Sequence, residues 1–273
     1  MRDFAKELPS HTEIYIGEHD LFVEIFEGDA LPGAVQPRPP LLFVHGAYTG
    51  SWMWSKYVPH FIRAGWTCYV MNLRSHYKSR LLDMTKITFD DYLEDIREII
   101  AACGVPPILV GFSMGGILSQ KLAETTLIAG LVLIDSVISR EVFEAVPYEQ
   151  MDWMAQGLIL PAPVREEISS LDETADDIEF QRKYLTMESS KAFGAFVFSS
   201  EAKGISIDSR SIVCPCLVVK AVGCEDDDRR GLVTAEHLRA EYKGLWHTTH
   251  TGVLVGQRYR EAVDTILDWL KRY

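Results

Sequence analysis

Residues 107–120 read PILVGFSMGGILSQ. The stretch opens with a short, continuous apolar run, which is typical of a strand buried on both faces of a parallel sheet. A helical pattern follows over 114–126. Ser113 lies at the junction, with glycine two residues away on either side, in a G-x-S-x-G arrangement. This order predicts a nucleophile elbow, in which a strained turn between strand and helix exposes a reactive serine.

Apolar runs of the same kind recur along the chain and alternate with helical patterns. Two strand-like segments with alternating polarity come first, joined by a short polar turn. The alternation predicts an α/β fold with a mostly parallel central sheet flanked by helices. The expected strands are 11–16, 20–26, 41–45, 66–71, 107–112, 130–135 and 214–223, and the expected helices are 51–64, 88–103, 114–126 and 258–272.

The alternation is interrupted after the strand at 130–135. Residues 137–210 are rich in Asp and Glu and helical in pattern, and only 195–199 resemble a strand. We expect one α/β domain over 1–273, in which 137–210 form a helical cap over the carboxyl edge of the sheet. Apolar residues of this cap are candidates to line a pocket: Met151, Trp153, Met154, Leu158, Leu160, Phe193, Phe196 and Phe198.

Composition restricts the classes of partner and compartment. The formal net charge is −12, and an acidic surface disfavours nucleic acid. Residues 1–13 lack the apolar region of a secretory signal, and no apolar run reaches the ~18 residues of a membrane span. We therefore expect a cytoplasmic protein with a small-molecule substrate and no membrane span. The sequence does not indicate an oligomeric state.

The cysteines do not form a recognisable ligand pattern. There are five, an odd number, and Cys214-Pro-Cys216 is not a C-x-x-C pair. A zinc site built from Cys214, Cys216 and Cys224 would lack a second ligand pair at finger-like spacing. We expect no metal and no organic cofactor.

A serine hydroxyl needs a base to become nucleophilic, and its reaction needs donors for the developing oxyanion. The helix after Ser113 offers the backbone N–H of Met114 at its positive end. The strand at 41–45 ends in His45-Gly46-Ala47, a second turn at the same sheet edge. This turn is placed to offer the N–H of Ala47. The predicted oxyanion hole is therefore formed by Ala47 and Met114.

Two blocks of the chain resemble the α/β-hydrolase superfamily. HGAYTGSWMW, starting at His45, is similar to the oxyanion turn of the esterase and hydroxynitrile lyase branch, and GFSMGG matches the family's elbow. Residues 72–79, NLRSHYKS, stand where the family often has DLRGHGxS, so the Asp and both Gly of that loop are replaced. The resemblance covers 11–136 and 212–273 and leaves the cap unaccounted for.

The resemblance implies a triad in the order serine, acid, histidine. The family's G-x-x-D pattern after a late strand falls on Gly223 to Asp226, so Asp226 is the predicted acid, with Asp227 and Asp228 as close rivals. Asp135 occupies the position that some branches use instead. For the base, the spacing before the last helix favours His250 over His247.

We do not expect the other histidines to act as the catalytic base. His45 is expected to fix the oxyanion turn at the end of its strand. The remaining ones are expected on the surface or in loops: His11, His19, His60, His76 and His237.

The function implied is a serine hydrolase that cleaves a small, largely apolar carboxylic ester through an acyl-enzyme. Carbon–carbon bond hydrolysis, perhydrolysis and hydroxynitrile cleavage use the same triad, and fold alone does not separate them. A non-catalytic ligand receptor on this scaffold is the alternative of another class. Epoxide hydrolases and haloalkane dehalogenases would carry Asp in place of Ser113.

Overall fold

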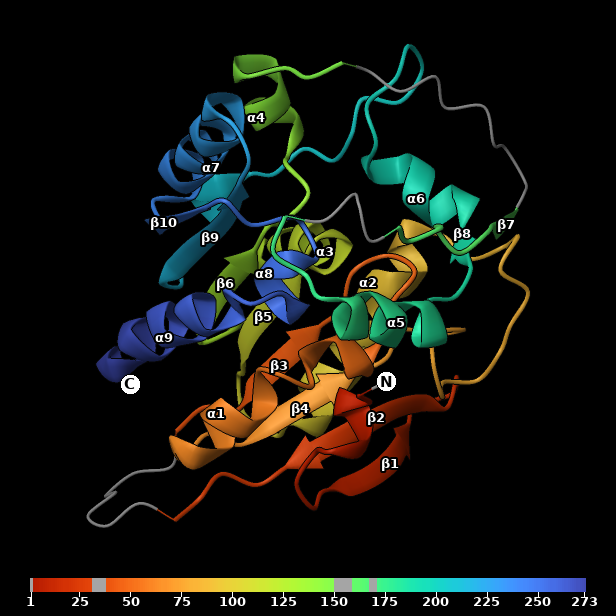
Figure 1. Ribbon diagram of the computed structural model, residues 1–273. Helices are drawn as coiled ribbons and strands as arrows, with labels where there is room; N and C mark the ends of the chain where they lie inside the picture. The colour runs from red at the N-terminus through yellow and green to blue at the C-terminus, as the bar shows by residue number, and fades with distance from the viewer. Residues whose placement is uncertain (1, 31–37, 150–158, 167–170) are drawn as a thin grey trace.

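The computed structural model describes residues 2–30, 38–149, 159–166 and 171–273. A mostly parallel, eight-stranded sheet crosses the molecule in the order β1-β2-β4-β3-β5-β6-β9-β10, with helices on both faces (Figure 1). β1 pairs antiparallel with β2 and β2 with β4, and all other pairs are parallel. The strands are β1 Thr12–Ile16, β2 Leu21–Phe26, β3 Leu41–Val44, β4 Cys68–Met71, β5 Ile108–Phe112, β6 Gly130–Ile134, β9 Cys216–Val222 and β10 Glu241–Trp246.

The sheet separates two apolar cores because successive strand side chains point to opposite faces. In β3, Leu42 and Val44 pack into one core, and Leu41 and Phe43 into the other. α2, α3 and α7 cover the first face, whereas α1, α8 and α9 cover the second. The helices are α1 Val58–Arg63, α2 Phe89–Ala102, α3 Met114–Ala123, α7 Glu225–Leu238, α8 Gly252–Val255 and α9 Tyr259–Trp269.

The sequence-predicted elements correspond to these with small differences. The expected start of α2 is confirmed, because Thr88 and Asp91 form a reciprocal capping box. The helix expected over 51–64 is divided into a 3₁₀ turn, Ser51–Trp54, and α1, which has a proline in its first turn. The terminal helix ends at Trp269 and continues as a 3₁₀ turn over Leu270–Arg272.

The segment between β6 and β9 is not purely helical. It contains α4 Arg140–Ala145, α5 Ala175–Tyr184 and α6 Ser190–Phe196, together with a short antiparallel ladder of β7 Ile159–Leu160 and β8 Glu188–Ser189. The strand expected over 195–199 does not form. Ser189 caps α6 by accepting from the Ala192 N–H, and the helix extends to Phe196. Met151, Trp153, Met154 and Leu158 lie outside the described residues.

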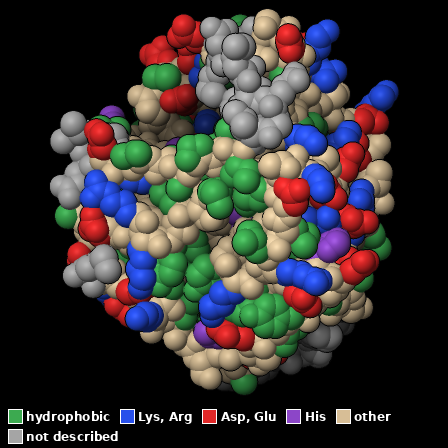
Figure 2. All heavy atoms as spheres, turned by 90° about the vertical axis from the view of Figure 1, so that its right-hand side faces the viewer, with side chains coloured by type: hydrophobic (Ala, Val, Ile, Leu, Met, Phe, Trp, Pro, Cys, Tyr) green, Lys and Arg blue, Asp and Glu red, His purple; other side chains and the backbone are tan. Residues whose placement is uncertain are grey.

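This insertion contacts the carboxyl edge of the sheet. The Thr186 N–H donates to the Tyr48 carbonyl at 2.9 Å, in the turn that follows β3. Figure 1 shows α5 and α6 on the same side of the molecule as β7 and β8. Apolar side chains are grouped across the middle of that side, among charged ones (Figure 2). None of the helices in the described ranges is long and apolar enough to cross a bilayer.

Candidate active site

The turn between β5 and α3 holds Ser113 in a backbone conformation that few side-chain-bearing residues adopt. Its φ is 53° and its ψ is −118°, and α3 begins at Met114. A Cβ at Gly115 would lie 2.3 Å from the Val44 carbonyl oxygen, and one at Gly111 would lie 2.5 Å from the Gly115 carbonyl oxygen. The two flanking glycines are therefore required by close backbone packing.

His250 lies between Ser113 and a carboxylate. Its Nε2 is 2.9 Å from Ser113 Oγ, and its Nδ1 is 2.5 Å from Asp135 Oδ2. With Nδ1 donating to the carboxylate, Nε2 of the neutral ring is free to accept the serine proton. The His250 side chain is 52% exposed, whereas that of Asp135 is 5% exposed. The imidazole is thus open to solvent, whereas the carboxylate beside it is shielded from water.

Asp135 directly follows β6, and its carboxylate accepts hydrogen bonds from three donors. Oδ2 accepts from His250, whereas Oδ1 accepts from the Lys220 ammonium and from the Ala221 N–H at 3.3 Å. Burial on its own would raise the pKa of Asp135. The charges of Lys220 and His250 outweigh it and lower the pKa of Asp135 to about 2. The carboxylate is therefore ionised at all ordinary pH values.

The acid predicted from the sequence, Asp226, is not brought to His250. Asp226 lies exposed in the first turn of α7. The helix starts immediately after β9, and carboxylates in a first helical turn are stabilised by its dipole. Its rivals have other partners: Asp227 pairs with Arg230 at 3.2 Å, and Asp228 accepts from the Tyr242 hydroxyl at 2.6 Å. The carboxylate that contacts His250 is Asp135.

The second candidate base lies apart from this arrangement. His247 is exposed at the end of β10, with a φ of 61°, and its N–H donates to the Val222 carbonyl at 3.1 Å. Within the described chain, no hydrogen bond joins its ring to Ser113 or Asp135. The residue that contacts Ser113 is His250.

The two predicted oxyanion donors lie on either side of Ser113. A Cβ at Gly46 would come within 3.0 Å of Ser113 Cβ, so the turn after β3 packs directly against the elbow. Ala47 follows in that turn, and Met114 opens α3. Neither backbone N–H has an acceptor among the described residues. Both amides are therefore available to a ligand oxygen near Ser113.

The sequence comparison agrees with this architecture. A sequence model described as the alpha/beta hydrolase family matches residues 41–264. The chain belongs to the alpha/beta hydrolase family. The match spans the elbow, the turn after β3 and His250, so all parts of the candidate site lie inside it.

Solved structures with the same fold as this hydrolase include several enzymes. One is described in a study of carboxylesterases of Nitrososphaera gargenis, at a TM-score of 0.66, 15% identity, and 96% and 99% coverage of this and that chain. Another is a monoacylglycerol lipase of Paleococcus ferrophilus, which has a TM-score of 0.66 and 18% identity. The alignment covers 92% of this chain and 98% of the lipase. A third is an enol-lactonase of Burkholderia xenovorans, which has a TM-score of 0.62 and 17% identity. The alignment covers 95% of this chain and 100% of the lactonase. No curated protein gave a significant match. At these identities the likeness shows the fold alone.

His45 of the hydrolase is fully buried at the end of β3. Its Nδ1 lies 2.8 Å from the Gly46 carbonyl oxygen, and its Nε2 accepts from the Leu73 N–H at 3.1 Å. Burial, reinforced by the neighbouring His76, lowers the pKa of His45 to about 3. A neutral ring thus joins the oxyanion turn to the loop after β4, which agrees with the role expected from the sequence.

His76 was expected on the surface or in a loop; it lies in the loop after β4, but its side chain is fully buried beside the insertion. Its Nε2 lies 3.1 Å from Glu188 Oε2, and Glu188 also accepts from the Tyr92 hydroxyl at 2.6 Å and the Tyr48 N–H at 3.3 Å. Burial lowers the pKa of His76, but the Glu188 charge outweighs it and the net shift is upward. Burial likewise raises the pKa of Glu188, and His76 reverses that shift. Both groups are therefore stabilised in their charged forms.

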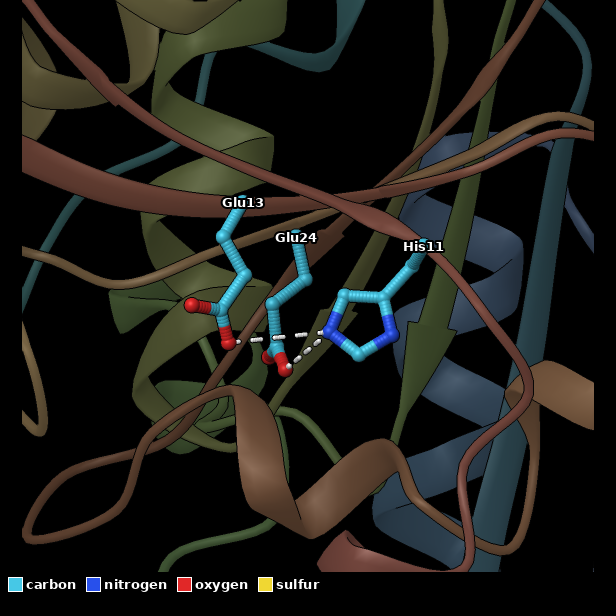
Figure 3. Close-up of side chains that lie close together, drawn as sticks. All are labelled: His11, Glu13 and Glu24. Atoms are coloured by element: carbon cyan, nitrogen blue, oxygen red, sulfur yellow. Dashed lines mark ion pairs between the residues drawn. The ribbon is translucent and has the colours of Figure 1, made fainter.

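One group of potential metal ligands occurs in the described part of the hydrolase. His11, Glu13 and Glu24 place ligand atoms within 4.8 Å of one another on the β1–β2 hairpin (Figure 3). The Lys78 ammonium already lies 2.7 Å from Glu13 Oε1, and His11 Nε2 lies 3.4 Å from Glu24 Oε1. β4 and β3 separate this hairpin from β5 and its elbow. The group is an ion-pair cluster remote from Ser113.

The contacts of Lys220 with Asp135 and of His76 with Glu188 were not predicted from the sequence. Lys220 is the only charged residue of β9, and a lysine inside an apolar strand is a signal that could have pointed to it. No pattern could have joined His76 to Glu188, because 111 residues separate them and the pairing depends on how the insertion returns to the sheet.

Proposed function

We propose that this hydrolase cleaves small, largely apolar carboxylic esters through a covalent acyl-enzyme. Ser113 is the nucleophile, His250 the general base and Asp135 the orienting acid. The observation that carries the proposal is the continuous chain of contacts from Ser113 Oγ through His250 to Asp135, built on a strained elbow. These contacts would allow the three residues to act as the nucleophile, the base and the orienting acid of a hydrolytic triad.

The chemistry proceeds in two steps. His250 Nε2 takes the hydroxyl proton as Ser113 Oγ attacks the ester carbonyl carbon, and the N–H groups of Ala47 and Met114 receive the oxyanion. The protonated ring then gives its proton to the departing alkoxide, leaving an acyl group on Ser113. His250 next deprotonates a water molecule that attacks the acyl carbon, and the returning proton regenerates the serine.

Aromatic side chains beside the oxyanion turn support an apolar substrate. Tyr48 follows Ala47 directly, and its ring centroid lies 5.7 Å from that of Phe193 in α6. Phe193 in turn packs on Phe196 at 4.8 Å. Burial, with the nearby Glu188, raises the pKa of Tyr48 to about 12, so its hydroxyl stays neutral. The insertion would thus act as a cap that places apolar aromatic rings of α6 beside the oxyanion turn.

Replacing the nucleophile tests the proposal. Ser113→Ala should retain the fold and lose ester hydrolysis by a factor on the order of 10⁴–10⁶ in kcat, because no other group can form the acyl-enzyme. The measurements are hydrolysis of p-nitrophenyl esters of increasing acyl length and mass spectrometry after fluorophosphonate treatment. Ser119→Ala is the matched control, since Ser119 is buried in α3 and donates only to the Gly115 carbonyl.

The labelling experiment has a decisive negative outcome. We expect a single phosphonylated serine, Ser113, in the wild type and in Ser119→Ala. Activity of folded Ser113→Ala within about tenfold of wild type, or labelling elsewhere, would contradict the proposed function, since loss of a triad member is far more damaging.

A further inference from the structure

The acid of the candidate triad has a cationic partner on the neighbouring strand. Lys220 lies near the carboxyl end of β9, which pairs with β6, and its side chain is 16% exposed. Its ammonium donates to Asp135 Oδ1. Burying an ammonium is unfavourable unless a charge partner compensates it. The contact with Asp135 is thus the reason that a lysine is tolerated in this strand.

Lys220 has no competing ion-pair partner within the described ranges. α7 lies tightly over its stem, since a Cβ at Gly231 would come within 3.0 Å of Lys220 Cβ. Titratable groups of α7 and β10 on this side contact one another. Tyr242 donates to Asp228, and Asp227 pairs with Arg230. The ammonium is therefore confined beneath α7 and directed at Asp135.

The two oxygens of Asp135 have separate tasks. Oδ1 is held by Lys220 and the Ala221 N–H, whereas Oδ2 faces His250 Nδ1. A carboxylate fixed at one oxygen cannot rotate away from the imidazole. The ring of His250 thereby stays oriented toward Ser113.

The charge of Lys220 has a second effect. An isolated carboxylate beside His250 would favour the protonated imidazole, which cannot act as a base. The Lys220 ammonium on the same carboxylate offsets that attraction, because Lys220 and Asp135 together carry no net charge.

We propose that Lys220 is a positioning residue of the triad that fixes Asp135 and extends the activity of the hydrolase toward acidic pH. The inference rests on the proposed function, because it requires that His250 act as the base. Among the titratable groups named above, Asp227 and Asp228 are paired with Arg230 and Tyr242, and Tyr242 also feels the charge of Asp135.

The test is the pH dependence of kcat/KM for p-nitrophenyl acetate in three variants. Lys220→Gln can still donate a hydrogen bond but lacks the charge, Lys220→Met lacks both, and Lys220→Arg keeps both. We expect the acidic limb of the profile to move to higher pH by about one unit in the Gln and Met variants, a tenfold change in proton affinity. The Arg variant should return it toward the wild-type position.

The value of kcat on the alkaline plateau of the pH profile tests the effect of Lys220 on the orientation of Asp135 separately from the effect of its charge. We expect Lys220→Met to lower kcat there by about tenfold, because Asp135 loses a fixed contact, a loss comparable to that of one hydrogen bond to a charged group. Lys220→Gln should lower it less. Lys243→Met is the matched control, since Lys243 is exposed on the adjacent β10 and its loss changes the net charge equally.

The outcomes distinguish this inference from the proposed function. Fluorophosphonate labelling of Ser113 in the wild type comes first, and its absence would overturn the proposed function itself. If the wild type is labelled and the folded Lys220 variants keep the wild-type acidic limb, or shift no more than Lys243→Met, the positioning role is wrong. Failure of both Gln and Met variants to fold would make Lys220 a purely structural residue and would also overturn it.

Discussion

Asp135 and Asp226 both follow parallel strands of the same sheet, yet only one of them reaches the histidine. Asp135 follows the last residue of β6 directly, has a φ of 39° and remains 5% exposed. Asp226 enters a helix at once and faces solvent. The family-like G-x-x-D spacing could not reveal this difference, because it does not say where α7 begins. The helix start, one residue before Asp226, moves that carboxylate away from the site.

At the residue scale, we predict that Asp135→Asn is the damaging substitution and Asp226→Asn is not. Loss of the Asp135 charge should lower kcat by a factor on the order of 10⁴, because the imidazole loses its orienting acceptor. Asp226→Asn should stay within about twofold of wild type, as surface substitutions remote from a site usually do. Steady-state hydrolysis of p-nitrophenyl acetate measures both, with circular dichroism to verify the fold. The reverse ranking would assign the acid to Asp226 in the first turn of α7.

At the scale of elements, the fully buried pair of His76 and Glu188 connects the loop after β4 to β8 of the insertion. The same Glu188 accepts the Tyr48 N–H, next to Ala47 in the turn after β3. Three elements that are distant in sequence thus share one carboxylate. Removal of one charge from a buried pair leaves the other uncompensated, which is a strongly destabilising change.

We expect Glu188→Gln to lower the free energy of unfolding by about 3 kcal/mol, the scale for a broken buried ion pair. The contribution of Glu188, whose pKa is lowered, is present above its unfolded pKa and is lost as pH falls through the folded value. The contribution of His76, whose pKa is raised, is present below its unfolded pKa and is lost as pH rises through the folded value. The difference from wild type should therefore be greatest between about pH 4.5 and 6.5.

Urea unfolding followed by tryptophan fluorescence at pH 5.5 and pH 9 measures this difference. Glu201→Gln is the control, because Glu201 is exposed in the same insertion and its carboxylate has no ion-pair partner in the described chain. An equal loss at both pH values would show that the ion pair does not provide the stabilisation.

The elements themselves were largely predictable from the sequence. Apolar runs bounded by turn residues place the central strands, and the Thr88–Asp91 spacing places the start of α2. Ser113 and His250 could be chosen because each is tied to a local pattern. The pairings of Lys220 with Asp135 and of His76 with Glu188 could not be predicted from the sequence, because such contacts depend on strand order and on the path of the insertion. These are tertiary facts without a local signature.

At the scale of the whole molecule, the insertion and the sheet meet over the turn after β3. We predict that Phe193→Ala shifts the relative kcat/KM among p-nitrophenyl esters of different acyl length while Ser113 remains reactive toward fluorophosphonate. The shift should be gradual, since an apolar pocket discriminates by only about 1–3 kcal/mol per methylene. Leu171→Ala, in the same insertion but largely exposed, should leave the profile unchanged. An unaltered profile in Phe193→Ala would place the acyl chain elsewhere.

The direct pairing of β6 with β9 also constrains how the chain folds. About 80 residues separate these adjacent strands, compared with the short crossover through α3 that joins β5 to β6. Closing so long a loop costs conformational entropy before any ladder hydrogen bond is made, and such non-local pairings tend to form slowly. Strands β1 to β6 can therefore assemble while the ribosome is still making the rest, with Ser113 and Asp135 already in place. Lys220 and His250 arrive only when β9 and β10 dock, so catalytic competence should be among the last properties that the newly made chain acquires.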